Sequence, residues 1–251
     1  MAISTRVQVN NDIYHELGEQ WYKAKDNPVA ILRAESKARD PWVVKEIHQA
    51  FPSGKAKILD VGCGAGFLSN ELVQQGFDVT GVDASKQSLE IAKKYDLTGR
   101  AQYQLGDANH LPFSDQSFNV VCAMDFLEHV DDPKQVVKEI SRVLRPQSLF
   151  FFHTLNRNFL TWLIGIKGLE WFVKNTPPNL HTYRNLIKPT EMNLYCQDAG
   201  MEVQQVLGSV PVIAQSAFWK LLVTGHVEDN FKFRLINFPL MGYLGVAKLI
   251  N

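Results

Sequence analysis

A glycine-rich loop is the first stretch whose residue types could do chemistry. Residues 62–66 read GCGAG and follow a mostly apolar run, 57–61, that contains Asp60. Glycine permits tight turns and lets a ligand approach the backbone amides without meeting a Cβ. In dinucleotide sites the pattern is Gly-x-Gly-x-x-Gly, but here the third glycine comes one position early and Phe67 fills the place where a pyrophosphate must lie close. The loop predicts a ligand site and disfavours a pyrophosphate.

The second such stretch is DFLEH, residues 125–129. In a helical turn, Asp125, Glu128 and His129 stand at positions i, i+3 and i+4 and share one face. Two carboxylates and an imidazole can hold a hard divalent cation such as Mg²⁺, chiefly through oxygen. Alternatively, His129 or the later His153 removes a proton as a general base, and Asp125 completes the candidate catalytic set. A purely structural role is the third interpretation of each histidine.

The elements that must position these residues alternate between strand and helix. Strands are predicted at 57–61, 78–82, 101–105, 118–124, 148–154, 202–207 and 242–250. Helices are predicted at 67–75, after a cap at Ser85 and after Asp132-Pro133, and an earlier one is predicted to begin at Asp40-Pro41. Continuous apolar strands separated by helices are typical of an α/β protein with a parallel sheet. Ligands then bind at the carboxyl ends of the strands, where both stretches lie.

Composition argues against several classes of function. The 251 residues carry 26 basic and 26 acidic side chains, so no net charge attracts nucleic acid. Three scattered cysteines are too few for a disulfide framework or a CxxC metal site. The N-terminus lacks the pattern of a signal peptide, and no run of about twenty apolar residues could span a bilayer. We therefore expect a cytoplasmic location.

The residues around the loop resemble the first motif of class I S-adenosylmethionine (SAM) methyltransferases. That motif, hydrophobic-Leu-Asp-x-Gly-x-Gly-x-Gly, is matched by residues 58–66. The resemblance implies that Asp83 accepts hydrogen bonds from both ribose hydroxyls, that Asp107 accepts one from the adenine amino group, and that Met124 packs on the adenine. It also implies an arginine on the SAM carboxylate, near Arg39. The expected cofactor-binding residues are Arg39, Asp60, Gly62, Cys63, Gly64, Gly66, Asp83, Ala84, Asp107, Ala108 and Met124.

Longer stretches resemble the ubiquinone-biosynthesis O-methyltransferase (3-demethylubiquinone 3-methyltransferase) family. The words CAMDFLEHVDDP, LRP, FFHTLNRN, LIKPTEM and GYLGVAK carry this likeness over most of residues 57–250. The likeness implies methylation of a catechol-type hydroxyl on a small aromatic, polyprenylated acceptor, with Mg²⁺ held at Asp125, Glu128 and His129. Asp125 departs from the family's usual glutamate, and residues 208–240 have no recognised counterpart. Methyltransferases for exocyclic amines of DNA carry Asn/Asp-Pro-Pro-aromatic after the fourth strand, so no nucleic-acid partner is expected.

The resemblance also implies an architecture. We expect a Rossmann-like class I methyltransferase fold with a seven-stranded, mostly parallel sheet and an antiparallel C-terminal strand. Residues 1–52 would form an N-terminal helical cover, 53–154 the SAM-binding core, and 155–251 the cap inserts and completing strands of the same domain. The two inserts, roughly 155–190 and 208–240, are too long for plain connections and are expected to cover the ligand.

Residues 159–173, FLTWLIGIKGLEWFV, admit two interpretations. The segment is too short to span a bilayer. It is either a core helix that closes the active site or an interfacial helix on the inner face of a membrane, with Trp162 and Trp171 at headgroup level. The function also keeps alternatives: another small acceptor, such as a carboxylate or carbon acid, or SAM binding without catalysis. The sequence leaves the oligomeric state open.

Overall fold

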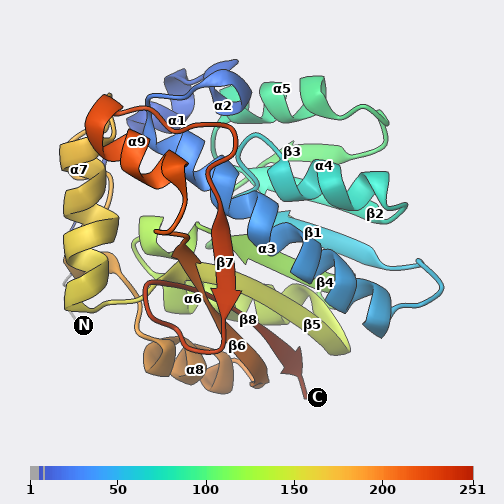
Figure 1. Ribbon diagram of the computed structural model, residues 1–251. Coiled ribbons are helices and arrows are strands. Elements are labelled where there is room, and N and C mark those ends of the chain that lie inside the picture. Colours follow the sequence, from blue (N-terminus) through green and yellow to red (C-terminus); the bar gives the residue numbers. More distant parts are fainter. Residues whose placement is uncertain (1–5, 8, 251) are drawn as a thin grey trace.

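One mixed β-sheet forms the centre of the computed structural model, which describes residues 6–7 and 9–250. Its strands lie in the order β3-β2-β1-β4-β5-β8-β6-β7 (Figure 1). β1 to β5 are parallel, whereas β8 is antiparallel to both β5 and β6, and β7 is antiparallel to β6. The strands are β1 (Lys57–Val61), β2 (Asp78–Asp83), β3 (Gln102–Leu105), β4 (Phe118–Met124), β5 (Leu144–Leu155), β6 (Met201–Pro211), β7 (Phe233–Ile236) and β8 (Gly242–Leu249).

The α/β fold with a mostly parallel sheet is confirmed, but the predicted number of strands is wrong. The sheet has eight strands rather than seven, because β7 in the second insert pairs with the outer edge of β6. Its four residues, FRLI, are short and only half-buried, so they lack the apolar pattern that marks a core strand. Residues 233–236 form a strand because they pair with β6, and the periodicity of the sequence alone could not show that pairing.

Helices cover both faces of the sheet. Apolar side chains of α3 (Pro28–Ala50) and α4 (Phe67–Gln74) pack on one face, with α5 (Lys86–Tyr95) beside α4. α6 (Pro133–Val143) and α8 (Pro189–Asp198) pack on the other. The predicted caps of α5 and α6 are confirmed: Ser85 accepts from the Ser88 amide at 3.2 Å and Asp132 from the Gln135 amide at 3.0 Å. These helices hold the carboxyl ends of β1 to β4 along one edge.

The predicted beginning of the first long helix at Asp40-Pro41 is wrong. α3 begins thirteen residues earlier, where the Asn27 side chain accepts from the Val29 amide at 3.1 Å and Pro28 occupies the first turn. Pro41 lies inside α3, where a proline costs about 3 kcal/mol. Burial of apolar residues on both sides of Pro41 offsets that cost, and Asp40 forms a buried ion pair with Arg39 instead of a cap.

The remaining elements lie around the carboxyl edge of the sheet. α1 (Asp12–Glu16) and α2 (Gln20–Lys23) lie beside α5, and the inserts form η2 (Thr161–Lys167), α7 (Gly168–Phe172), η3 (Tyr183–Asn185) and α9 (Ser216–Thr224) (Figure 1). α7 and α9 contact each other. Residues 1–5 and 8 of the predicted N-terminal cover lie outside the described residues. Among the described residues, the longest apolar helices still fall short of what crossing a bilayer requires.

Candidate active site

A cavity of about 620 Å³ lies at the carboxyl ends of β1 to β4. Ten of the eleven predicted cofactor-binding residues line it: Arg39, Asp60, Gly62, Cys63, Gly64, Asp83, Ala84, Asp107, Ala108 and Met124. They meet there because parallel strands place their carboxyl ends at one edge, beside the point where strand order reverses at β1 and β4. The eleventh, Gly66, ends the loop outside this lining, and an added Cβ there would come within 2.6 Å of the Tyr103 hydroxyl.

Two separate physical reasons favour glycine at positions 62 and 64 of the loop. Gly62 and Gly64 have φ angles of 69° and 51°, in the left-handed region that favours glycine. A Cβ on Gly62 would also collide with the Phe126 ring, and one on Gly64 would lie 3.1 Å from Trp21. The loop is therefore held between an aromatic residue that follows β4 and another from the N-terminal helices, and its open side faces the cavity.

Carboxylates brace this cavity. Asp83 accepts from the amides of Gly64 and Ser85, each at 2.8 Å, and keeps further acceptor lone pairs for a ligand. Asp60 is buried and accepts from the Ser69 hydroxyl at 2.6 Å, and burial raises its pKa to about 7. Asp107 is exposed, and hydrogen bonds from Asn109 lower its pKa. Asp83 thus links the glycine loop to the start of α5.

A second cavity, of about 320 Å³, adjoins the first. Tyr14, Leu32, Asp125 and His129 line both, so the two cavities meet at these side chains. The walls of the second cavity come from η2, α7, α9 and the strands β6 to β8, and they are almost entirely apolar. Its polar groups gather at the end near the junction: Glu35, Asp125, Glu128, His129 and His181, with Ser209.

A buried charge cluster fixes Asp125 at the junction. One Asp125 oxygen pairs with Arg39, and the other lies 2.5 Å from His153 Nδ1. His153 Nε2 in turn lies 3.2 Å from Glu35 Oε1. Burial alone would raise the pKa of Asp125, but Arg39 and His153 outweigh burial and lower it below its usual range. Asp125 adopts a φ of 53°, unusual for a residue other than glycine, which turns its carboxylate toward this cluster.

The two predicted catalytic histidines have opposite environments. His153 is fully buried, and burial alone would lower its pKa, but Asp125 and Glu35 outweigh burial and raise it to about 10. His129 is half-buried, and burial lowers its pKa to about 3. At neutral pH His153 is therefore a cation without a free lone pair, whereas His129 is neutral, keeps a free lone pair and is a weak base.

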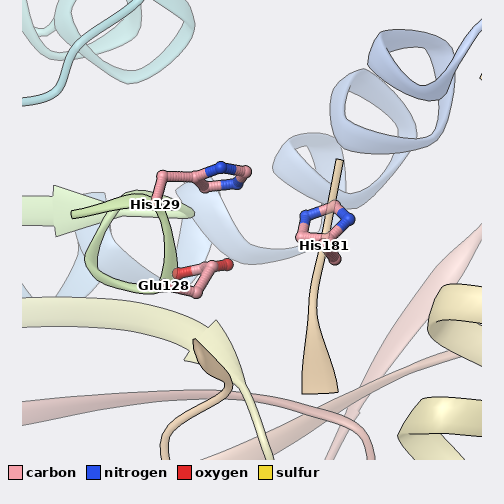
Figure 2. A group of neighbouring side chains, drawn as sticks. All are labelled: Glu128, His129 and His181. Carbon is pink, nitrogen blue, oxygen red and sulfur yellow. The ribbon is translucent and has the colours of Figure 1, made fainter. Parts of the chain in front are cut away.

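The predicted metal-ligand set is divided between two clusters. Ligand atoms of Glu128, His129 and His181 lie within 4.8 Å of one another, and their side chains converge (Figure 2). Asp125 instead groups with Glu35 and His153. The η1 turn (Leu127–His129) is a 3-10 helix rather than the α-helical turn that the i, i+3, i+4 argument assumed. Asp125 lies two residues before η1, and its positive φ departs from helical geometry.

Sequence reasoning missed four residues of the site. Glu35 comes from the middle of α3, and His181 from the loop between α7 and η3. Tyr14 and Asn11 come from the N-terminal segment, and Asn11 Oδ1 lies 3.0 Å from His129 Nδ1. The aromatic-rich stretch YHELGEQWY was the available signal for Tyr14. Neither the residue type nor the spacing of Glu35 and His181 sets them apart in the sequence.

Known proteins similar to this chain are described as methyltransferases. Residues 59–152 match a family described as a methyltransferase domain. A ubiquinone biosynthesis O-methyltransferase from Aromatoleum aromaticum is 32% identical over 198 residues, which cover 78% of this chain and 82% of that protein. One of the same description from an Azoarcus species is 38% identical over 155 residues, covering 61% of this chain and 66% of that protein.

Solved structures show the same fold at low sequence identity. Magnesium protoporphyrin IX methyltransferase from Synechocystis PCC 6803, solved with bound SAH, aligns with a TM-score of 0.63 and 16% identity. The alignment covers 94% of this chain and 96% of that one. At this identity the likeness establishes the fold and leaves the acceptor undetermined.

Proposed function

The chain belongs to the ubiquinone biosynthesis O-methyltransferase family of SAM-dependent methyltransferases, and we propose that it methylates a hydroxyl of a small aromatic acceptor such as a catechol or polyprenyl phenol. The observation that carries this proposal is the meeting of the two cavities at Asp125 and His129. The first cavity suits the cofactor and the second suits an apolar acceptor. A polyprenyl tail fits the long apolar wall, and the aromatic head fits the polar end.

Methyl transfer from a sulfonium is an in-line displacement, in which a C–O bond forms while the S–C bond breaks. Alignment supplies most of the rate, because well-oriented intramolecular reactions reach effective molarities of roughly 10⁵ M or more. In our proposal Asp83 and the 62–66 loop hold the nucleoside, Met124 packs on its adenine, and Arg39 lies near the SAM carboxylate. Asp125 acts as a positioning residue, since Arg39 and His153 already hold its carboxylate.

The acceptor hydroxyl must also lose its proton, since a phenol has a pKa of about 10. We assign the proton acceptor to the junction because His129 lines both cavities. Burial lowers the pKa of His129 and makes it a weak base, so in this proposal the negative charge of the phenolate that forms beside it raises that pKa. His153 does not suit this task, because it is buried and already protonated at neutral pH. The Asn11 side chain accepts the Nδ1 proton of His129 and so leaves Nε2 free toward the acceptor.

Besides SAM, the sequence analysis expected Mg²⁺ at Asp125, Glu128 and His129. These three residues do not fit it well, because both Asp125 oxygens are engaged by Arg39 and His153. Two of the three converging donors in the other cluster are imidazoles, whereas Mg²⁺ prefers oxygen. Our proposal therefore derives no step through Mg²⁺.

Residues 159–173 are assigned two roles in this proposal. Leu163, Ile164 and Leu169 line the acceptor cavity, so the segment closes the site. Trp171 also lines that cavity, yet 62% of it is exposed. We propose that the segment both covers the acceptor and rests on a membrane that supplies a prenylated acceptor. In this division residues 1–52 cover the cofactor, 53–154 bind it, and 155–251 form the cap and complete the sheet.

Transfer of tritium from methyl-labelled SAM to a panel of catechols and polyprenyl phenols tests the function. We expect label in the phenols and a loss of about 10²-fold or more in His129→Gln. Binding of SAH, measured by calorimetry, should be unchanged in that variant. His226→Gln is the matched control, since His226 pairs with Lys174 on the surface.

The outcomes separate the remaining alternatives. If only carboxylates or carbon acids carry the label, the acceptor is one of these small molecules and the phenol assignment is wrong. Tight SAH binding without label in any acceptor would favour a SAM-binding protein without catalysis. Full activity in His129→Gln would remove this residue from the mechanism.

A further inference from the structure

We propose that Glu35 and Ser209 form a specificity subsite in the second cavity, which binds a second hydroxyl of the acceptor and rejects a carboxylate in the same place. Both side chains line that cavity. Glu35 comes from the middle of α3 and Ser209 from β6, so only the tertiary structure brings them together. The subsite rests on the proposed function for the reaction and adds the class of acceptor, a phenol with an unmethylated hydroxyl beside the reacting one.

Ser209 carries a buried hydroxyl that a ligand can satisfy. Its exposed fraction is 1%, and Oγ has no hydrogen-bond partner among the described residues. Buried polar groups in proteins are nearly always hydrogen-bonded, because an unpaired one keeps its full desolvation cost. The cavity walls around it are almost entirely apolar. Ser209 therefore favours a ligand that carries a polar group at this point of the cavity.

Gly242 lets Glu35 lie close to Ser209. Ser209 on β6 pairs directly with Gly242 on β8, and both line the cavity. Directly paired residues of antiparallel strands point to one face, with Cβ positions about 5 Å apart. An added Cβ on Gly242 would lie 3.1 Å from Glu35 Oε1 and 3.0 Å from His153 Nε2. The bare glycine thus leaves room for the carboxylate over the strand, on the face of the Ser209 hydroxyl, so one ligand group can contact both.

Glu35 ends a buried chain of alternating charges. Asp40 pairs with Arg39, Arg39 with Asp125, Asp125 with His153, and His153 with Glu35. The two neighbouring carboxylates raise the pKa of His153 to about 10, so it is a cation at neutral pH. Three carboxylates therefore alternate with two cations. The chain holds one more negative than positive charge, and Glu35 is its end in the acceptor cavity.

The neighbouring groups do not compensate this charge. His129 and His181 are neutral, because burial lowers their pKa values to about 3 and about 4. The described residues that line the cavity include no lysine and no arginine. A hydroxyl can donate a hydrogen bond to Glu35 and accept one from Ser209. A carboxylate has no proton to donate and would meet a like charge, so the subsite rejects it.

Four prenylated phenols that differ only in the group beside the reacting hydroxyl test the subsite. That group is a hydroxyl, a hydrogen, a methoxy group or a carboxylate, and tritium transfer gives kcat/KM for each phenol. We expect the wild type to prefer the hydroxyl over hydrogen and methoxy about tenfold or more. The preference over carboxylate should be about 100-fold or more. Each variant is compared with the wild type on the same phenols, so differences in their intrinsic reactivity cancel.

Ser209→Ala removes one hydroxyl and no hydrogen bond between described residues. It should lower kcat/KM for the dihydroxy phenol about tenfold, mainly through KM, and leave the hydrogen-substituted phenol within about twofold. Ser141→Ala is the matched control and should leave these ratios unchanged. The Ser141 hydroxyl donates to the Ala199 carbonyl at 2.6 Å, on α6, which packs on the other face of the sheet from α3.

Glu35→Gln keeps an oxygen beside His153 Nε2 and removes the negative charge. The preference for hydroxyl over carboxylate should therefore fall about tenfold or more. Calorimetry with SAH confirms that each variant is folded.

Two outcomes would overturn the subsite: an equal loss for all four phenols in Ser209→Ala, or an unchanged hydroxyl-to-carboxylate preference in Glu35→Gln. Calorimetry of the same phenols with SAH present repeats the comparison as binding affinities, without methyl transfer. Label in none of the phenols would contradict the proposed function. A loss of affinity in Ser209→Ala for the dihydroxy phenol alone would then still support the subsite.

Discussion

At the scale of single residues, environment decides what each histidine can do. His153 lies between two carboxylates and is protonated, whereas His129 lies beside Asn11 and His181 and is neutral. His153 lies within the apolar strand β5 and His129 follows the apolar strand β4, and both have acidic residues nearby in sequence or space. Only the neutral one can bind a metal or accept a proton, so the chemistry is assigned by burial and by partners rather than by residue type.

Asp83 offers the most direct residue-level test of the cofactor site. Asp83→Ala removes the acceptor of the hydrogen bonds from the Gly64 and Ser85 amides. It also removes the proposed acceptor for the ribose hydroxyls. A hydrogen bond to a charged group contributes about 1.5–3 kcal/mol, so we expect SAH affinity to fall roughly 10- to 100-fold in calorimetry. Asp78→Ala, at the exposed opposite end of β2, is the matched control. Equal affinities in the two variants would contradict the assignment.

The pKa of His153 predicts a pH dependence of stability. It is about 6.5 in an unfolded chain and is raised to about 10 in the folded protein. A raised histidine pKa adds stability that is fully present below pH about 6.5 and is lost as pH rises through about 10. The urea midpoint of the wild type should therefore fall between pH 7 and pH 10.

His153→Gln isolates this contribution. The variant is less stable at every pH, but its midpoint should fall less steeply across the same window. Asp60, whose pKa burial raises to about 7, titrates in both proteins and cancels in the comparison. Glu128 does not cancel fully, because His153 lowers its pKa. Parallel pH profiles for the two proteins would show that His153 is not the titrating group.

At the scale of elements, α3 and the glycine loop position the site. Glu35 and Arg39 stand one helical turn apart on α3 and reach His153 and Asp125 at the strand ends. The loop meets this helix across the cofactor cavity. Because α3 continues through Pro41, both side chains project from one rigid element.

Two glycines with the same backbone preference but different surroundings test the loop. Gly62→Ala places a Cβ against Phe126 at positive φ, so we expect SAH affinity to fall more than about tenfold. Gly76→Ala has a φ of 96° with open space around the new Cβ, so it should cost only about 1–2 kcal/mol of stability and spare SAH binding. Calorimetry measures SAH affinity and urea unfolding measures stability. Equal loss of SAH affinity in the two variants would contradict the steric argument.

At the scale of the whole molecule, the two inserts share one surface. α7 and α9 contact each other (Figure 1). Both carry exposed apolar side chains: Trp171 and Phe172 on α7, with Trp219 and Val223 on α9. The same two helices line the acceptor cavity from within. A single cap therefore provides both the wall of the cavity and the proposed membrane contact.

Co-sedimentation with anionic phospholipid vesicles tests this contact. The pair Trp171→Glu and Trp219→Glu should abolish sedimentation, because aromatic side chains favour the headgroup region and carboxylates oppose anionic lipid. Leu97→Glu is the control, since Leu97 is 86% exposed but follows α5, outside the inserts. Sedimentation that persists in the double variant would leave the inserts as a cap alone.

The amino-acid sequence by itself determined the features that depend on local patterns. Alternating apolar strands and helices, the caps at Ser85 and Asp132, and the glycine loop after β1 are encoded within short windows, and each is confirmed. The order of the motif acids along the chain was also sufficient to indicate the family and the lining of the first cavity.

Only the tertiary structure decided which side chains share a site. His181 and Glu35 join the junction from remote elements, Asp125 turns away from Glu128, and β7 extends the sheet. The physical reason is that charge state and ligand grouping depend on burial and on distances through space. Residues from 26 to more than fifty positions apart in the chain set those quantities, and no local pattern records them.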